Sequence, residues 1–309
     1  MAASSLAVTA AGIEFQNPVL LAAGTAAYGR ELASLIDLEE LGGLVTKAVS
    51  LERRHGARAP RVAEFDGGMI NAVGLANPGV DEVRAEHLPW LAEHVRRAKV
   101  LVNVVGNQVE EFGGVVSELD DSPAVSGYEL NVSCPNVRAG GMEFGADDTS
   151  LAAVVSKARA ATRKPIFVKL SPTLSNIAKS AKVAAAAGAD GITVVNTLPG
   201  LAIDVETRKP ALGFGTGGVS GPGLLPVGVL AAYRVAKAVE LPVIGVGGIS
   251  KATDVVQYVL AGASLVAIGT AAMQEPRLPQ KVIRELEKWC RQHDVKSLAD
   301  LRGALQWES

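Results

Sequence analysis

The chain has few cysteines, few aromatic residues and almost no net charge. Only Cys134 and Cys290 occur among its 309 residues, which excludes a disulfide framework and any four-thiolate iron–sulfur cluster. A net charge of −2 without runs of like charge offers no basic field to a nucleic acid. These shortages favour an enzyme with free thiols that acts on a small molecule.

Apolar runs long enough to cross a membrane are also missing. Runs such as 19–23 have the length of a strand, far short of the ~20 residues that a membrane span needs. The first 16 residues lack a basic segment followed by an apolar core, so they do not have the pattern of a secretory signal. We therefore expect a cytoplasmic protein without a membrane or nucleic-acid partner.

The sequence is rich in glycine, with 33 residues, and in short apolar runs that alternate with helical patterns. Eight runs have the composition of buried strands: Pro18–Ala23, Gly43–Thr46, Val100–Val105, Gly127–Asn131, Ile166–Leu170, Gly191–Val195, Pro242–Val246 and Leu265–Ile268. Helices are expected at Glu31–Leu38, Val80–Arg97, Val109–Ser117, Ser150–Thr162, Leu174–Ala187, Leu225–Val239, Thr253–Ala261 and Leu278–His293. Continuous apolar strands separated by helices indicate a parallel sheet that is covered on both faces.

Eight such units over about 250 residues match the size of a closed (β/α)8 TIM barrel. An open doubly wound sheet is the alternative, and it predicts fewer strands and a G-x-G-x-x-G turn that this sequence lacks after its first strand. We predict one barrel domain over residues 1–309. Two long connections, 49–77 and 196–226, should lie at the catalytic face, where loops that follow barrel strands are found.

Polar or glycine residues mark the carboxyl end of every predicted strand. They are Gly24-Thr25, Lys47, Asn103, Asn131, Lys169, Asn196-Thr197, Gly247-Gly248 and Gly269-Thr270. Because these ends meet at one barrel mouth, buried amides and ammonium groups there imply a polar ligand. The glycine turns after strands seven and eight predict a phosphate site made of backbone N–H groups.

A cysteine follows the fourth strand, in the segment from Glu129 to Asn136. None of the four histidines lies at a strand end, so a base that works near neutral pH has to come from another side chain. A thiol has a pKa of ~8.5, which cationic neighbours lower, so Cys134 can serve. Cys290, on a late helix, is interpreted as a buried and inert residue.

Together these segments resemble the class 1 dihydroorotate dehydrogenases over nearly the whole chain. The Asn131-to-Asn136 loop and the segment from Asn71 to Leu75 are specific to this family, whereas the glycine turns are consistent with it without being specific. Further matches are 17–25, 46–47, 77–79, 168–172, 196–197 and 217–222. The sequence departs from the family at Ala23, where many relatives have serine, so that a hydroxyl contact to the flavin is lost or replaced by the backbone.

The resemblance implies an FMN cofactor in the barrel mouth and a reaction that oxidises dihydroorotate to orotate. Cys134 would take a proton from C5 of the substrate while hydride leaves C6 for the flavin. The implied FMN-binding residues are Ala23, Gly24, Lys47, Ala48, Asn103, Asn131, Lys169, Val195, Gly221, Gly247, Gly248, Gly269 and Thr270. The implied substrate-binding residues are Lys47, Asn71, Ala72, Val73, Gly74, Leu75, Asn131, Asn196 and Thr197. These side chains suit the chemistry, because asparagine matches the imide edges of a pyrimidine and lysine stabilises reduced flavin.

The loop 136–145 and the run 217–222 look most like class 1B of this family. That class passes electrons to NAD through a partner subunit with FAD and a [2Fe-2S] cluster, and the expected assembly is a homodimer core within a heterotetramer. The membrane-bound class has a serine base and an N-terminal extension, whereas this chain begins almost at its first strand. Three alternatives stay open: the fumarate-reducing class 1A, another FMN barrel acting on dihydropyrimidines, and a flavin-free, phosphate-binding lyase or synthase.

Overall fold

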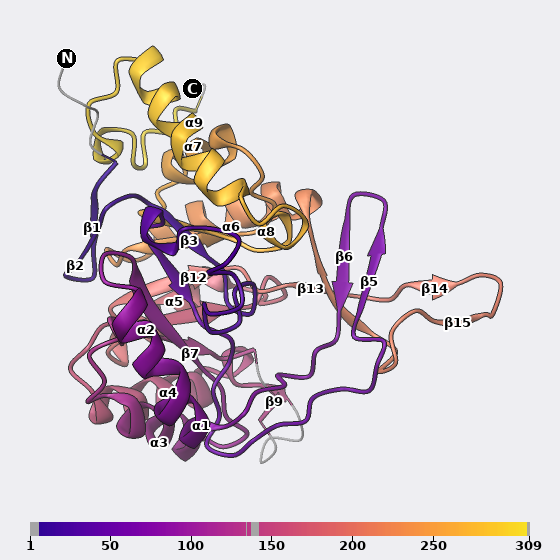
Figure 1. The fold of residues 1–309 in the computed structure, drawn as a ribbon. Helices are drawn as coiled ribbons and strands as arrows, with labels where there is room; N and C mark the ends of the chain where they lie inside the picture. The colour runs from indigo at the N-terminus through magenta and orange to yellow at the C-terminus, as the bar shows by residue number, and fades with distance from the viewer. Residues whose placement is uncertain (1–5, 134, 137–141, 308–309) are drawn as a thin grey trace.

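A computed structural model describes residues 6–133, 135–136 and 142–307 of the chain. Eight parallel strands close into a barrel in the order β11-β12-β17-β18-β3-β4-β7-β8, which confirms the predicted (β/α)8 architecture (Figure 1). Their bounds are β3 (Val19–Leu21), β4 (Gly43–Val45), β7 (Lys99–Val104), β8 (Gly127–Asn131), β11 (Ile166–Leu170), β12 (Gly191–Val194), β17 (Val243–Val246) and β18 (Leu265–Ile268). All eight predicted strands are therefore present, within two residues at either end.

Helices cover the outside of this barrel. They are α1 (Val80–Glu82), the π-helical turn η2 (Val83–His87) and α2 (Leu88–His94), then α3 (Val109–Leu119), α4 (Asp148–Ala161), α5 (Ile177–Ala186), α6 (Leu225–Ala236), α7 (Ala252–Leu260), α8 (Thr270–Gln274) and α9 (Leu278–Gln292). Helix α5 begins three residues later than predicted because the Asn176 side chain accepts a hydrogen bond from the Lys179 backbone N–H and so caps it there.

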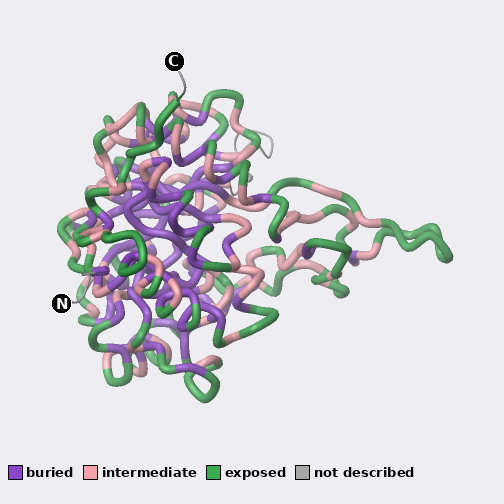
Figure 2. The backbone as a smooth tube through the Cα atoms, turned by 90° about the horizontal axis from the view of Figure 1, so that it is seen from above, coloured by how far each residue is buried: buried purple, intermediate pink, exposed green. Residues whose placement is uncertain are grey.

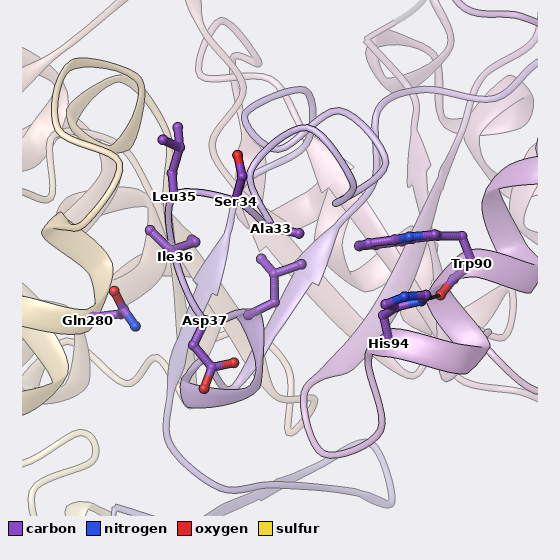
Figure 3. A pocket seen from close by; sticks show the side chains of 9 residues that line it. Ala33, Ser34, Leu35, Ile36, Asp37, Trp90, His94 and Gln280 are labelled. Atoms are coloured by element: carbon purple, nitrogen blue, oxygen red, sulfur yellow. Dashed lines mark hydrogen bonds between the residues drawn. The ribbon is translucent and has the colours of Figure 1, made fainter.

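The helix predicted over Glu31–Leu38 does not form. This segment is a run of turns that ends in the short 3₁₀ helix η1 (Leu38–Glu40), whose start is fixed by Asp37 accepting a hydrogen bond from the Glu39 N–H at 2.9 Å. The Asp37 cap therefore starts a separate 3₁₀ helix at Leu38, so that no single helix runs through this segment. The helical ring has a gap here, a groove of about 560 Å³ between Trp90 and His94 of α2 and Gln280 of α9 (Figure 3).

Both long connections fold into a second, antiparallel sheet with the strand order β13-β16-β6-β5. Its strands are β5 (Val62–Phe65), β6 (Gly68–Asn71), β13 (Leu198–Gly200) and β16 (Gly217–Ser220), and a hairpin of β14 (Ile203–Asp204) and β15 (Lys209–Pro210) extends it. Figures 1 and 2 show this arm projecting from the barrel. Sequence analysis predicted only loops here, because these glycine-rich strands lack an apolar alternation.

The barrel interior is closed at the end opposite its mouth. A hairpin of β1 (Val8–Ala10) and β2 (Ile13–Phe15) places Ala10 and Phe15 in the same buried cluster as Leu20, Phe167 and Leu265. Burial of the strands is almost complete, as the purple core of Figure 2 shows. Within the described residues, none of the helices has the length and apolar character of a membrane span.

Candidate active site

The inner wall of the barrel is polar along four neighbouring strands. Asn103 of β7 is in register with Glu129 of β8, and Asn131 of β8 is in register with Lys169 of β11, which pairs in turn with Thr193 of β12. Register partners on parallel strands share one face, so these side chains all face the interior. Asn103, Glu129, Lys169 and Thr193 are buried despite their polarity.

The lysine and the glutamate of this wall form a buried ion pair. Lys169 Nζ lies 3.7 Å from Glu129 Oε1, and their side chains are only 8% and 1% exposed. The Asn103 side-chain amide donates to the same Glu129 oxygen at 2.8 Å. A fixed carboxylate therefore holds two of the predicted flavin-binding side chains, Asn103 and Lys169.

The predicted substrate-binding residues meet in two groups. Asn196 Nδ2 donates to Asn131 Oδ1 at 3.2 Å, which joins the ends of β12 and β8. Asn71 Nδ2 donates to the Gly218 carbonyl oxygen at 3.3 Å, and Thr197 packs so closely on Gly218 that a Cβ there would lie 2.0 Å from its hydroxyl. The arm sheet therefore brings Asn71 and Thr197 together.

The segment that follows Asn71 is partly open to solvent. Ala72, Val73 and Leu75 are half-buried, and Gly74 is exposed. Gly74 and Leu75 both have a positive φ, of 70° and 55°. Lys47, at the end of β4, is half-buried, and its ammonium group makes no hydrogen bond or ion pair with any described residue. Lys47 therefore differs from Lys169, whose charge is already matched.

The opposite wall carries glycines and unused backbone donors. Gly247 and Gly248 follow β17 with φ of 126° and 70°, and Gly269 follows β18. Among the described residues, the N–H groups of Gly247, Gly248 and Gly269 donate to no protein acceptor. A Cβ added at Gly269 would meet nothing closer than 3.7 Å, so this backbone borders open space.

Tyr258 of α7 fixes the first of these turns. Its hydroxyl donates to the Gly247 carbonyl oxygen at 2.9 Å, and the Gly248 N–H of the same planar peptide therefore points the opposite way. The ring fits only because Gly228 and Gly245 lack side chains, since a Cβ at either would approach it within about 2 Å (1.9 Å and 2.2 Å). Burial raises the pKa of the Tyr258 hydroxyl, so it stays a donor.

The N-terminus of α7 is already occupied by a side chain. Asp254 Oδ2 accepts hydrogen bonds from Ser250 N at 2.9 Å and Lys251 N at 3.1 Å. Two N–H groups of this turn are therefore already used by Asp254, whereas those of Gly247 and Gly248 stay available to an anion among the described residues. Thr270, at the start of α8, donates through its hydroxyl to Ser220 Oγ at 2.7 Å, which ties the second glycine turn to strand β16 of the arm.

Other predicted flavin-binding residues lie around the same mouth. Ala48 and Val195 are buried at the ends of β4 and β12, Ala23 is half-buried and Gly24 is exposed after β3. Gly221 follows β16 with φ of 124°, where a Cβ would lie 2.7 Å from Gly68.

Cys134 itself lies outside the described residues, and so does the loop 137–141. The flanking segments are described: β9 (Pro135–Asn136) pairs with β10 (Met142–Glu143). Burial raises the pKa of the Glu143 carboxyl, and a hydrogen bond to Ser171, two residues beyond Lys169, acts against that rise. The hydroxyls of Ser133 and Thr193 are buried without a partner among the described residues, and so can accept a ligand.

Sequence reasoning missed four residues that organise this mouth: Glu129, Ser220, Asp254 and Tyr258. Glu129 gave a usable signal, because an acidic residue in the middle of a buried strand requires a partner. The other three sit on a glycine-rich strand or on helices, where nothing local distinguishes them. No group of His, Cys, Asp and Glu within the described part of the chain could hold a metal ion.

Fold and site together define a (β/α)8-barrel enzyme whose chemistry takes place at the carboxyl ends of the strands. A model of the dihydroorotate dehydrogenase family matches residues 5–290, and the chain belongs to that family. It is 44% identical over 301 residues to the dihydroorotate dehydrogenase B (NAD(+)) catalytic subunit of Pelobacter propionicus. The aligned residues cover 97% of this chain and 98% of that subunit. The subunits of the same description from Geobacter sp. strain M21 and Alkaliphilus metalliredigens are 43% and 44% identical, over 97% of this chain and 98% and 99% of theirs.

Proposed function

We propose that this chain is the cytoplasmic catalytic subunit of an NAD-linked dihydroorotate dehydrogenase, which oxidises dihydroorotate to orotate in pyrimidine biosynthesis. One observation carries the proposal: a single mouth joins a polar wall of asparagines and lysines to an opposite wall whose glycine N–H groups donate to no acceptor among the described residues. The first suits a pyrimidine and the second suits a phosphate. The full-length similarity to catalytic subunits supports the same assignment.

The residues present fit FMN. The N–H groups of Gly247, Gly248 and Gly269 would hold its phosphate, and the open space beside Gly269 leaves room for it. The remaining residues that would surround the cofactor are Ala23, Gly24, Lys47, Ala48, Asn103, Asn131, Lys169, Val195, Gly221 and Thr270. Bound FMN would supply the two-electron acceptor that takes hydride from C6 of the substrate.

The chain's own residues would bind the substrate and move its proton. Lys47, whose charge is unmatched within the described residues, would bind the carboxylate of dihydroorotate. Asn131 and Asn196, already joined to each other, would present amide edges to the ring, with Thr197 and the segment 71–75 closing over it. Cys134, on the loop after β8, would take the proton from C5, because none of the four histidines lies at the end of a barrel strand.

Electrons would leave through a partner. Two cysteines cannot supply the four thiolates of a ferredoxin-type iron–sulfur cluster, so we propose a separate subunit with FAD and a [2Fe-2S] cluster, docked on a homodimer of this chain. The purified chain should be yellow, contain one FMN and reduce artificial dyes with dihydroorotate, but it should not reduce NAD. Co-expression with the partner should confer NADH formation, measured at steady state.

Each competing function predicts a different result. Efficient fumarate reduction by the isolated chain would assign it to class 1A, and rapid NAD reduction without a partner would contradict both classes. Turnover of a different dihydropyrimidine in preference to dihydroorotate would assign it to another FMN barrel. A colourless protein that does not take up added FMN would indicate a flavin-free lyase or synthase.

A further inference from the structure

One charged residue inside the barrel has no part in the proposed reaction. Glu129 lies in the middle of β8, with its side chain 1% exposed and directed at the interior. It is not among the groups that bind substrate or move the proton. Burying a carboxylate is costly unless it is paired and hydrogen-bonded, so its partners indicate what it does.

Those partners are Lys169 and Asn103. Glu129 Oε1 lies 3.7 Å from the lysine ammonium and accepts a hydrogen bond from the asparagine amide at 2.8 Å. The asparagine fixes the carboxylate from β7, and the carboxylate in turn compensates the ammonium on β11. The three residues lie on adjacent strands. Asn103 and Glu129 share one layer of the barrel interior, and Lys169 lies in the next layer toward the mouth.

We propose that Glu129 is a positioning residue, the fixed counter-charge that keeps Lys169 protonated both before and after the flavin is reduced. The inference rests on the proposed function, because it requires FMN above Lys169. A buried ammonium without its carboxylate loses its proton more readily, since burial disfavours the charged form. It would then regain that proton when reduced FMN brings negative charge next to it.

Proton uptake on reduction is therefore the measurement that follows. In the wild type, the midpoint potential of bound FMN should fall with pH as expected for one proton per two electrons over an alkaline pH range. In Glu129→Gln it should fall as expected for two protons over part of that range. A loss of packing alone would not change the number of protons.

Other titratable groups near Lys169 require a control. Among the described residues of the mouth they are Lys47 at the end of β4 and Glu143, which hydrogen-bonds Ser171 in the loop after β11. Thr193 of β12 and Asn131 of β8 carry no charge. If the second proton goes to Lys169, then Glu129→Gln combined with Lys169→Met should return to one proton. Persistence of the second proton in that double variant would overturn the assignment.

If Glu129→Gln does not fold, Glu129→Asp can replace it, because it withdraws the carboxylate from Lys169 by one methylene. The number of protons that this variant takes up on reduction of its FMN should rise above one at the upper end of the pH range. A count of one at every pH in the folded variants would overturn the inference alone, provided that the wild type binds FMN and is reduced by dihydroorotate. A wild type that binds no FMN would overturn the proposed function and the inference with it.

Discussion

The two halves of the barrel wall use the same strand architecture for opposite purposes. On β7, β8, β11 and β12, the inner face carries asparagine, glutamate, lysine and threonine, and nearly every one of these groups is engaged with a neighbour. On β17, β18 and β3, the inner face carries Val246, Ala267 and Leu20, and polar function passes to the backbone beyond the strands. Lys47, at the end of β4, belongs with the polar side chains of the first group. Side chains provide the polar groups of the first half, whereas backbone N–H groups at glycines provide those of the second.

This difference separates the tasks of the site. A pyrimidine ring requires donors and acceptors at fixed points, which side chains on rigid strands provide. A phosphate requires several N–H groups at close range, which glycine permits because no Cβ stands in the way. Changes in the polar half should therefore alter the reaction and its energetics, whereas changes in the glycine half should alter cofactor retention.

The largest effect is expected beyond β8 in the polar half. Cys134→Ala should lower the rate of flavin reduction by dihydroorotate roughly 10²- to 10⁴-fold, because general-base assistance contributes that much. Binding of FMN and orotate should persist. Stopped-flow flavin absorbance measures the rate, with Cys290→Ala on α9 as the control. Cys134→Ser should be intermediate, with its rate profile moved to higher pH. An alanine variant that reacts at the wild-type rate would remove Cys134 as the base.

A smaller effect, a loss of orotate affinity, is expected when the ammonium group of Lys47 is removed. Lys47→Met should weaken orotate binding by about 1.5–3 kcal/mol, or roughly 10- to 150-fold, because a charge-assisted hydrogen bond is lost. Titration of the flavin spectrum with orotate measures this affinity. Lys182→Met, an exposed lysine on α5, is the matched control. Equal orotate affinity in both variants would place the carboxylate site elsewhere.

The glycine half should respond through the cofactor. Gly269→Val should weaken FMN binding roughly 5- to 150-fold, the effect of about 1–3 kcal/mol of overpacking, because its side chain would fill the open space in which a Cβ meets no protein atom within 3.7 Å. Gly248→Ala should instead destabilise the apoprotein, since its Cβ would lie 2.4 Å from Leu225 N at a φ of 70°. Full FMN retention in Gly269→Val would exclude this turn as the phosphate site.

The smallest effect tests how that turn is held. Tyr258→Phe removes the hydrogen bond to the Gly247 carbonyl and should weaken FMN binding roughly 2- to 10-fold, since a neutral hydrogen bond contributes about 0.5–1.5 kcal/mol. Tyr233→Phe on α6, whose ring contacts Trp307 instead, should bind FMN as tightly as the wild type. Fluorescence titration of the apoproteins measures both affinities. Identical values would show that the turn keeps its shape without Tyr258.

The eight barrel strands could be predicted because each is a continuous apolar run, and a buried parallel strand leaves that pattern in its own residues. The strand-end residues could be predicted for the same reason, since a known strand has a known end. The helix predicted over Glu31–Leu38 was wrong, because a helical pattern does not reveal that Asp37 caps a competing turn. The arm sheet was missed because the β6–β16 pairing that joins its two halves spans more than a hundred residues, and because three of its four strands contain glycine.

By itself, the sequence determined the barrel, the order of its strands along the chain and the polar or glycine character of each strand end. Only the tertiary structure decided which of these groups are free. It matched Lys169 with Glu129 and placed Asp254 at the α7 N-terminus. Among the residues that the structure describes, it left Lys47 unmatched and the N–H groups of Gly247, Gly248 and Gly269 unused. The reason is physical: composition is local, whereas the pairing of a charge or a donor depends on what barrel closure brings within 3–4 Å of it.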